Sequence, residues 1–297
     1  MSLTPEWEKR IKKYIDALRV LFSREIAPLP LSVFTTLEQL TPGQALARDF
    51  KPIAEGERWG EMWEYGWFRG RVTLPAEAQG QWVNARVNVG GEGLVFINGQ
   101  PTCSVGGHRW IQLAELSRQA KAGESFDILV EAYAGHGPRE WQATVFHGQE
   151  PWPDRPGLQA VMGHCAVETW DEEAFQLFVD AKTLLGVRNA APAESLRVAE
   201  VDAALRDFTV ILDLAAPPEK RAAMIRQCRE RLRPALSCVN GTCAPEFFCF
   251  GHAHLDVGWL WPIQESERKI ARTLSNTLAL IKEYPEYVYL QSQPQLF

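Results

Sequence analysis

The chain has 297 residues, of which 46% are hydrophobic and 23% charged, and its formal net charge is −6. These fractions are those of an ordinary globular protein, and the length corresponds to roughly two domains. A net negative charge argues against a nucleic-acid partner, and the absence of any apolar run near ~18 residues argues against a membrane span.

The first ten residues are rich in charge and contain no apolar segment of the kind that a secretory signal requires. Six cysteines in 297 residues are too few to indicate a disulfide framework. These features together predict reduced thiols and a cytoplasmic protein.

Residues 1–32 are predicted to form an N-terminal helical segment. Apolar residues follow helical spacing over 5–22, and Thr4-Pro5 is a favourable start for a helix. Pro28 ends this element, because proline lacks the amide hydrogen that a continuing helix needs.

Residues 33–169 are predicted to form an antiparallel β-sandwich. Apolar and polar residues alternate with period two over 68–74, 82–89 and 126–133, which is typical of strands with one buried face. Asn98-Gly99 lies between two short apolar runs and is a strong signal for a tight hairpin. Short strands with no helical pattern between them favour a sandwich.

The pattern becomes helical over residues 170–244, which we predict to be a helical linker. Pro192 and Pro217-Pro218 separate three apolar stripes into three consecutive helices. The stripes contain Phe175, Phe178, Ala181 and Leu185; Leu205, Phe208, Ile211 and Leu212; and Ile225, Cys228, Leu232 and Leu236.

Residues 245–297 are predicted to begin a parallel β/α barrel that is incomplete in this chain. The continuous apolar run at 246–250 indicates a strand buried on both faces. An amphipathic helix over 263–284 and a second strand at 287–290 would complete a βαβ unit. The apolar face of this helix holds Ile270, Leu274, Leu278 and Ile281.

The residues with the clearest chemical potential lie in the loop between this strand and this helix. Sites in α/β folds form where loops leave the carboxyl ends of strands. If extended geometry continues, His252, His254 and Asp256 point the same way, because side chains alternate with period two. Imidazole and carboxylate groups suit zinc, and a catalytic zinc takes about three protein ligands. The alternative is that these side chains only hydrogen-bond the backbone at a strand end.

Tryptophan is unusually abundant, with 11 residues, and Trp259 and Trp261 follow the histidine loop directly. Because the apolar faces of sugars stack on indole rings, tryptophans beside a metal fit a carbohydrate site. The alternative is that both are core residues. Six others in the sandwich are candidates for a sugar-stacking platform or for its core. These are Trp59, Trp63, Trp67, Trp82, Trp110 and Trp141.

The segment from Phe250 to Phe297 strongly resembles the start of the catalytic domain of class II α-mannosidases, glycoside hydrolase family 38. The residues that carry the likeness read GHAHLDVGWLWPIQESERKIARTLSNTLALIKEYPEYVYLQSQPQLF. A glycine and histidine, then H-x-D and Gly-Trp, match the family motif residue by residue. The upstream layout resembles the bacterial and cytosolic branch, which has a jelly-roll sandwich resembling galactose-binding domains before a helical linker.

The resemblance implies a multidomain α+β protein whose last segment starts a seven-stranded β/α barrel. It implies a retaining α-mannosidase that uses one zinc ion and removes terminal α-mannosyl residues from oligosaccharides. His254 and Asp256 match the first two zinc ligands of the family, and Trp259 matches the tryptophan that packs under the terminal mannose. The resemblance places the nucleophile, the acid/base and the remaining ligands downstream of Phe297.

Retaining cleavage needs two carboxyl groups about 5–5.5 Å apart. Asp256 as a zinc ligand cannot also be the acid/base. Glu265 and Glu267 are predicted to lie in solvent, at the charge-balanced start of the helix beside Arg268 and Lys269. We therefore expect no catalytic residue within these 297 residues, and no turnover by them alone.

Two other functions stay open on the residues alone. An H-x-H after a first barrel strand, here His252 and His254, also resembles amidohydrolases and predicts a different metal-dependent hydrolase. The other alternative is that the sandwich acts as a carbohydrate-binding or structural module without catalysis. The exposed strand edge at 287–297 predicts association or partial disorder, and association would give a homo-oligomer.

Overall fold

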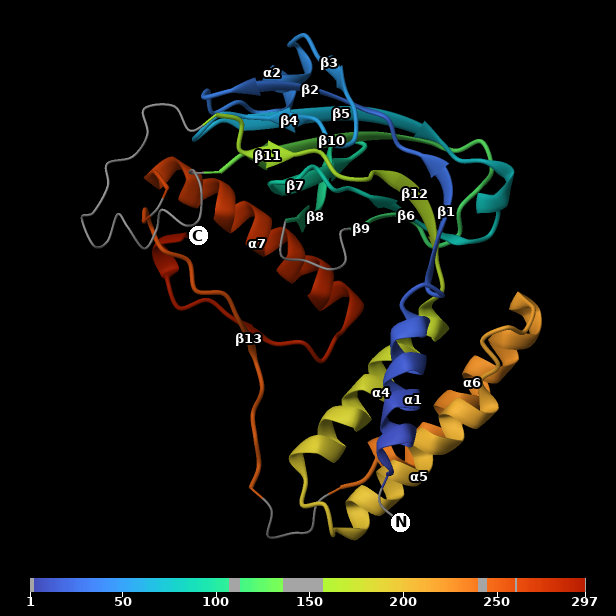
Figure 1. Cartoon of the computed structure of the whole chain (residues 1–297). Coiled ribbons are helices and arrows are strands. Elements are labelled where there is room, and N and C mark those ends of the chain that lie inside the picture. Colours follow the sequence, from blue (N-terminus) through green and yellow to red (C-terminus); the bar gives the residue numbers. More distant parts are fainter. Residues whose placement is uncertain (1–2, 107–112, 136–156, 240–244, 260, 297) are drawn as a thin grey trace. The chain divides into compact units, whose positions relative to one another are not determined.

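The computed structural model describes residues 3–106, 113–135, 157–239, 245–259 and 261–296, and it divides into two compact units. One unit comprises Met1–Arg24 and Thr169–Glu246 and is mainly helical (Figure 1). The other comprises Glu25–Glu168 and Phe247–Phe297 and contains most of the β-structure. In the described part of the chain, no helix has both the length and the apolar character needed to cross a membrane.

The helical unit consists of α1 (Pro5–Leu18), α4 (Glu172–Ala190), α5 (Leu196–Ile211) and α6 (Pro218–Leu236). Thr4 caps α1 as predicted, because its side chain accepts a hydrogen bond from the amide of Trp7. Ile11, Leu205 and Leu232 are fully buried in one shared core. The N-terminal helix and the three helices of the predicted linker therefore pack as a single unit.

The chain leaves α1 earlier than the helical spacing predicts. α1 ends at Leu18, and β1 (Ser23–Pro28) already belongs to a sheet of the sandwich. Phe22 nevertheless packs against the rings of Trp170 and Phe175. Phe22 is therefore apolar because it packs in the core of the helical unit, although it does not belong to α1. Because β1 precedes residue 32, the predicted boundary between residues 32 and 33 falls inside the sandwich.

The sandwich has a four-stranded sheet in the order β1-β12-β6-β9 and a six-stranded sheet in the order β3-β2-β5-β10-β7-β8. The strands not yet given are β2 (Leu31–Thr36), β3 (Lys51–Ile53), β5 (Tyr65–Thr73), β6 (Trp82–Arg86), β7 (Glu92–Ile97), β8 (Gln100–Val105), β9 (Leu113–Ser117), β10 (Ser125–Tyr133) and β12 (Ala166–Trp170). Smaller elements are α2 (Pro42–Leu46), the paired strands β4 (Arg58–Trp59) and β11 (Ala160–Val161), and 3₁₀ turns at Ala76–Ala78 and Pro294–Leu296. Val72, Val83 and Val130, taken from the three alternating runs, share one buried core, so the predicted sandwich is confirmed.

The hairpin between β7 and β8 is the one that Asn98-Gly99 predicts. Both residues have positive φ angles, 50° at Asn98 and 79° at Gly99, as a two-residue type I′ turn requires. The Asn98 side chain also accepts a hydrogen bond of 2.9 Å from the amide of Asp127, which ties the turn to β10.

The C-terminal segment forms the predicted βαβ unit from β13 (Gly251–His252), α7 (Ile263–Glu283) and β14 (Tyr289–Leu290), with the two strands parallel. The run at 246–250 is not the doubly buried strand that its composition predicts. Phe247 is 81% exposed and Phe248 is 83% exposed, because no second layer covers them within the described residues. One parallel pair does not establish a barrel.

Helix α7 lies along the six-stranded sheet, near β7 and β8 (Figure 1). The side of α7 that faces the sheet is polar. Its buried residues are Glu265, Ser266, Arg272 and Thr277. Leu278 and Ile281 of the apolar stripe are instead 66% and 43% exposed. The prediction that Glu265 lies in solvent is therefore wrong, whereas Glu267 is exposed as predicted.

The carboxylate of Glu265 is buried because it finds partners on both sides. The Tyr65 hydroxyl, from β5, donates a hydrogen bond of 2.9 Å to it, and the Arg272 guanidinium donates from one side of α7. Burial raises the pKa of Glu265, and the positive charge of Arg272 opposes that rise. A buried charge is tolerated only when it is paired and hydrogen-bonded, so this cluster determines which side of α7 faces the sheet.

Further polar contacts follow the same side of α7. They are Arg268 with Glu131 at 3.2 Å, Lys269 with Glu92 at 2.6 Å, the Asn276 side chain with the Ser104 amide at 2.8 Å, and Glu283 with Arg118. Glu131 is 2% exposed, and burial raises its pKa while Arg268 opposes the rise. At Glu131 and Glu92 the sheet thus provides the acidic group and the helix the basic one, whereas at Glu283 the helix provides the acidic group.

We expect Glu265→Ala to lower the free energy of unfolding of this unit by about 3 kcal/mol or more, because it leaves Arg272 buried without its main partner. Glu267 lies two residues further along α7 and is exposed, so Glu267→Ala should change the free energy of unfolding by less than about 0.5 kcal/mol. Urea unfolding followed by tryptophan fluorescence measures both. Equal effects of the two substitutions would contradict the buried pair.

His164 connects two acidic side chains elsewhere in this unit. Its Nε2 lies 2.8 Å from Glu25 and its Nδ1 lies 3.1 Å from Glu55. The hydrogen bonds to Glu25 and Glu55 raise the pKa of His164 above its ordinary value of 6.5. Because only the protonated ring can donate from both nitrogens, both hydrogen bonds form only when His164 is charged.

The stabilisation from the two hydrogen bonds of His164 should be fully present below about pH 6.5 and should be lost as the pH rises through the higher folded-state pKa of His164. An NMR titration of the His164 ring should give a pKa above 6.5. Glu25→Gln should move that pKa downward, since it removes the largest contribution. A wild-type His164 pKa at or below 6.5 would contradict the two hydrogen bonds to Glu25 and Glu55.

Candidate functional site

The histidine loop follows β13, and its first histidine is held at the strand end. Residues 253–256 belong to no helix or strand. His252 Nδ1 donates a hydrogen bond of 2.9 Å to the carbonyl of Leu290, and its Nε2 lies 3.5 Å from the Ser292 hydroxyl. His252 therefore ties β13 to β14, which is the backbone-binding role that the sequence left open for it.

His254 and Asp256 come together as a pair. His254 Nε2 lies 3.2 Å from Asp256 Oδ1, with 69% and 43% of the two side chains exposed. Within the described ranges, no group of three or more His, Cys, Asp or Glu side chains is arranged to hold a metal ion. The structure thus joins two of the three alternating residues and leaves His252 out of their group.

The spacing of this pair fits two ligands of one zinc ion. Zinc bonds to imidazole nitrogen and carboxylate oxygen are about 2.0–2.1 Å long, so tetrahedral coordination places neighbouring donor atoms roughly 3.3 Å apart. The observed 3.2 Å agrees with that value, and it also suits an ion pair when the imidazole is protonated. The pair is therefore compatible with part of a zinc site, to which other groups must contribute.

The loop turns at Gly258, whose φ of 72° lies in the left-handed region that favours glycine. The turn leaves Trp259 55% exposed, with its ring edge-on to Trp261 at a centroid distance of 5.6 Å. Trp261 is half-buried, and the Lys269 ammonium lies 4.4 Å from its ring centroid. The alternative that both tryptophans are core residues fails for Trp259.

The tryptophans of the sandwich serve mainly as core and packing residues. Trp59 is 3% exposed and its indole donates a hydrogen bond of 2.7 Å to the Val89 carbonyl, and Trp67 is fully buried. Trp63 and Trp82 are half-buried, and the Arg118 guanidinium lies 4.1 Å from the Trp82 ring centroid. Trp110 and Trp141 lie outside the described residues. Because Trp59 and Trp67 are buried, they are not available for the predicted sugar-stacking platform.

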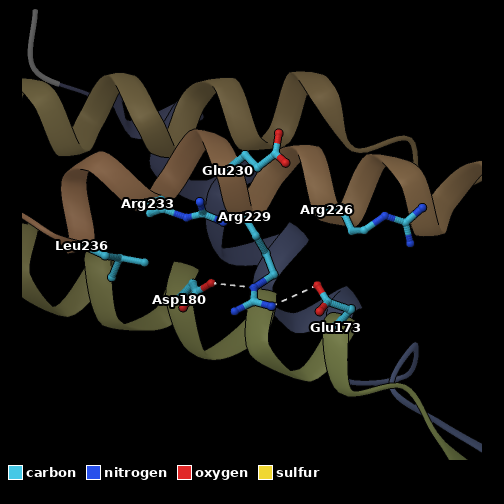
Figure 2. Close-up of a pocket in the computed structure, with 7 residues that line it drawn as sticks. All are labelled: Glu173, Asp180, Arg226, Arg229, Glu230, Arg233 and Leu236. Atoms are coloured by element: carbon cyan, nitrogen blue, oxygen red, sulfur yellow. Dashed lines mark hydrogen bonds and ion pairs between the residues drawn. The ribbon is translucent and has the colours of Figure 1, made fainter.

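A cavity of about 300 Å³ lies between α4 and α6 in the helical unit (Figure 2). It is lined by Glu173, Asp180, Arg226, Arg229, Glu230, Arg233 and Leu236. Arg229 crosses it to reach Asp180 at 3.1 Å and Glu173 at 3.0 Å. Three arginines and three carboxylates are among its lining residues, so the formal charges balance. Sequence periodicity did not single out this groove, because its charged residues follow the ordinary spacing of a solvated helix face.

Two family models match separate parts of the chain. Residues 27–144 match the model described as "Alpha-mannosidase, jelly roll domain", which covers most of the sandwich. Residues 244–297 match the model described as "Glycosyl hydrolases family 38 N-terminal domain". The second match includes the βαβ unit and the loop with His254, Asp256 and Trp259.

Curated relatives match along nearly the whole chain. Human "Alpha-mannosidase 2C1" is 26% identical over 309 residues, covering 97% of this chain and 28% of the relative. "Alpha-mannosidase G" of Dictyostelium discoideum is 23% identical, covering 90% of this chain and 24% of the relative. The chain thus spans only 28% of the length of the human relative.

Solved structures of bacterial β-glucuronidases show a more distant likeness. The Faecalibacterium prausnitzii enzyme is 16% identical with a TM-score of 0.34, over 51% of this chain and 32% of the other. A Ruminococcus gnavus enzyme is 16% identical with a TM-score of 0.34, over 50% and 29%. No functional argument rests on a likeness of this size.

Proposed function

The chain belongs to the class II α-mannosidases of glycoside hydrolase family 38, and we propose that it supplies part of the metal and sugar site of such an enzyme. The observation that carries the proposal is the pair His254–Asp256, 3.2 Å apart, beside the exposed indole of Trp259. All three residues lie in the segment that matches the family 38 catalytic domain.

In this proposal, His254 Nε2 and Asp256 Oδ1 are two ligands of a zinc ion. A zinc ion held there would grip neighbouring hydroxyls of the sugar and orient its ring. Trp259 offers the apolar face of its indole to the terminal mannose, which excludes water from one side of the ring. Asp256, as a ligand, is not available as the acid/base.

We further propose that the whole protein hydrolyses terminal α-mannosyl residues of oligosaccharides with retention of configuration. That reaction needs a carboxylate nucleophile and a carboxylic acid about 5–5.5 Å apart. Asp256 is assigned to the metal, and Glu265 is bound to Arg272 and Tyr65. Neither is therefore proposed for this pair, whose members would come from other residues.

A cytoplasmic location is likewise a proposal. It is supported by the described cysteines, which form no disulfide with one another, as in a reducing compartment. Fractionation of source cells with detection of the native protein would test it, and recovery from a secretory fraction would overturn it.

The homo-oligomer permitted by the edge at 287–297 stays a prediction, which the molar mass in solution would decide.

We expect His254→Ala and Asp256→Asn each to weaken zinc binding by the chain at least about tenfold, because each removes a ligand. His252→Ala should change the affinity little, since that ring is bound to Leu290. Competition with a chromophoric chelator measures all three, and His164→Gln serves as a matched histidine control. Loss of zinc in His252→Ala but not in Asp256→Asn would favour a different metal-dependent hydrolase, and no zinc binding by the wild type would overturn the proposal.

We expect that the 297 residues alone do not hydrolyse p-nitrophenyl α-mannoside, because we assign neither Asp256 nor Glu265 to the two carboxyl groups of the retaining mechanism. Release of p-nitrophenol by the pure chain is measured against a buffer blank. Steady release that disappears in Asp256→Asn would show that the chain carries its own catalytic pair.

A further inference from the structure

Ser266 lies at the centre of a set of hydrogen bonds that reach the histidine loop from α7. Its Oγ accepts hydrogen bonds from the Gly258 amide at 3.0 Å and from the Trp261 indole at 3.1 Å. The same hydroxyl donates to the Asp256 carbonyl at 3.2 Å. One donated and two accepted bonds use the full capacity of a hydroxyl group. Ser266 is 3% exposed, so water has little access to replace these bonds.

The three bonded groups bracket both candidate binding residues of the loop. Asp256 itself is bonded through its carbonyl, and Trp259 lies between the bonded residues Gly258 and Trp261. One side chain therefore restrains the backbone at the proposed metal ligand Asp256 and at Gly258, just before the proposed sugar-binding indole, and it holds the side chain of Trp261 after that indole. Sequence reasoning missed Ser266, because a serine in the first turn of a helix is ordinary.

Ser266 is held in place by its neighbour in the chain. Glu265 is fully buried and accepts hydrogen bonds from Tyr65 and Arg272, which fixes the first turn of α7 against the six-stranded sheet. Successive residues of a helix point in different directions, so Glu265 contacts the sheet while Ser266 contacts the loop. The loop is also held from its other side, where the Gln293 side chain accepts a hydrogen bond of 3.2 Å from the Leu255 amide.

We propose that Ser266 is a positioning residue for the metal and sugar site. Its hydroxyl keeps Asp256 within reach of the zinc position beside His254 and keeps Trp259 at the surface. What the loop binds rests on the proposed function, whereas the hold of Ser266 on the loop does not require a metal.

Hydrogen exchange of the metal-free 297-residue chain tests the hold on the loop. Ser266→Ala should speed exchange of the Gly258 amide at least about tenfold, because the amide loses its acceptor. Ser266→Thr keeps the hydroxyl and should restore slow exchange. Ser275→Ala is the matched control on the same helix, since Ser275 is half-buried and takes no part in the hydrogen bonds between Ser266 and the loop.

Unchanged exchange in Ser266→Ala, or a threonine variant that behaves like alanine, would overturn the proposal. Exchange in β10, read from the same data, shows whether the sandwich stays folded. If Ser266→Ala also loosens β10, the near-isosteric Ser266→Cys takes its place, because a thiol is a weak hydrogen-bond partner. In Ser266→Cys the Gly258 amide should again exchange faster than in the wild type.

Zinc affinity is the second readout, with the metal alone as the probe. Ser266→Ala should weaken zinc binding by about tenfold, as expected for a group that orients a ligand, and Ser266→Thr should restore it. Faster loop exchange with unchanged zinc affinity would overturn the positioning role. No zinc binding by the wild type would overturn the proposed function instead, and the exchange data would then decide alone whether Ser266 holds the loop.

Discussion

The buried carboxylate of Glu265 is the constraint on which the C-terminal part of the structure depends. A charge removed from water must be paired, and Tyr65 and Arg272 supply its partners at the surface of the sheet. The helix is therefore placed by polar contacts, and the apolar residues Leu278 and Ile281 stay largely on the exposed side. An amphipathic helix here buries the side that its hydrophobic pattern would leave in water.

This placement has a direct effect on the candidate site. Because Glu265 fixes the first turn of α7, the adjacent Ser266 reaches back to the loop between Asp256 and Trp261. Residues 253–259 belong to no helix or strand, so these side-chain contacts, rather than a sheet, hold the loop. The sandwich thus contributes to the site as a support for α7.

The sandwich itself offers less for sugar binding than its composition suggests. Trp59 and Trp67 are consumed by packing, in the way that large aromatic residues usually contribute to a β-sandwich. The indole that we propose for sugar binding is Trp259, which is 55% exposed and lies in the loop rather than in the sheets. The family matches follow the same division, because one covers most of the sandwich and another covers the loop and the βαβ unit.

The sequence by itself determined the features whose causes lie within a few residues. The Thr4 cap, the Asn98-Gly99 hairpin and the alternation of β10 follow from local backbone and side-chain chemistry, and the H-x-D motif identified the family. Only the tertiary structure decided that Glu265 is buried, that His252 is held apart from His254, and that Ser266 supports the loop. Tyr65 and Glu265 are 200 residues apart, and His252 and Leu290 are 38 residues apart, so no local pattern contains those contacts. Ser266 bonds to residues 5 to 10 positions before it, but that contact exists only because the chain folds back between the loop and α7.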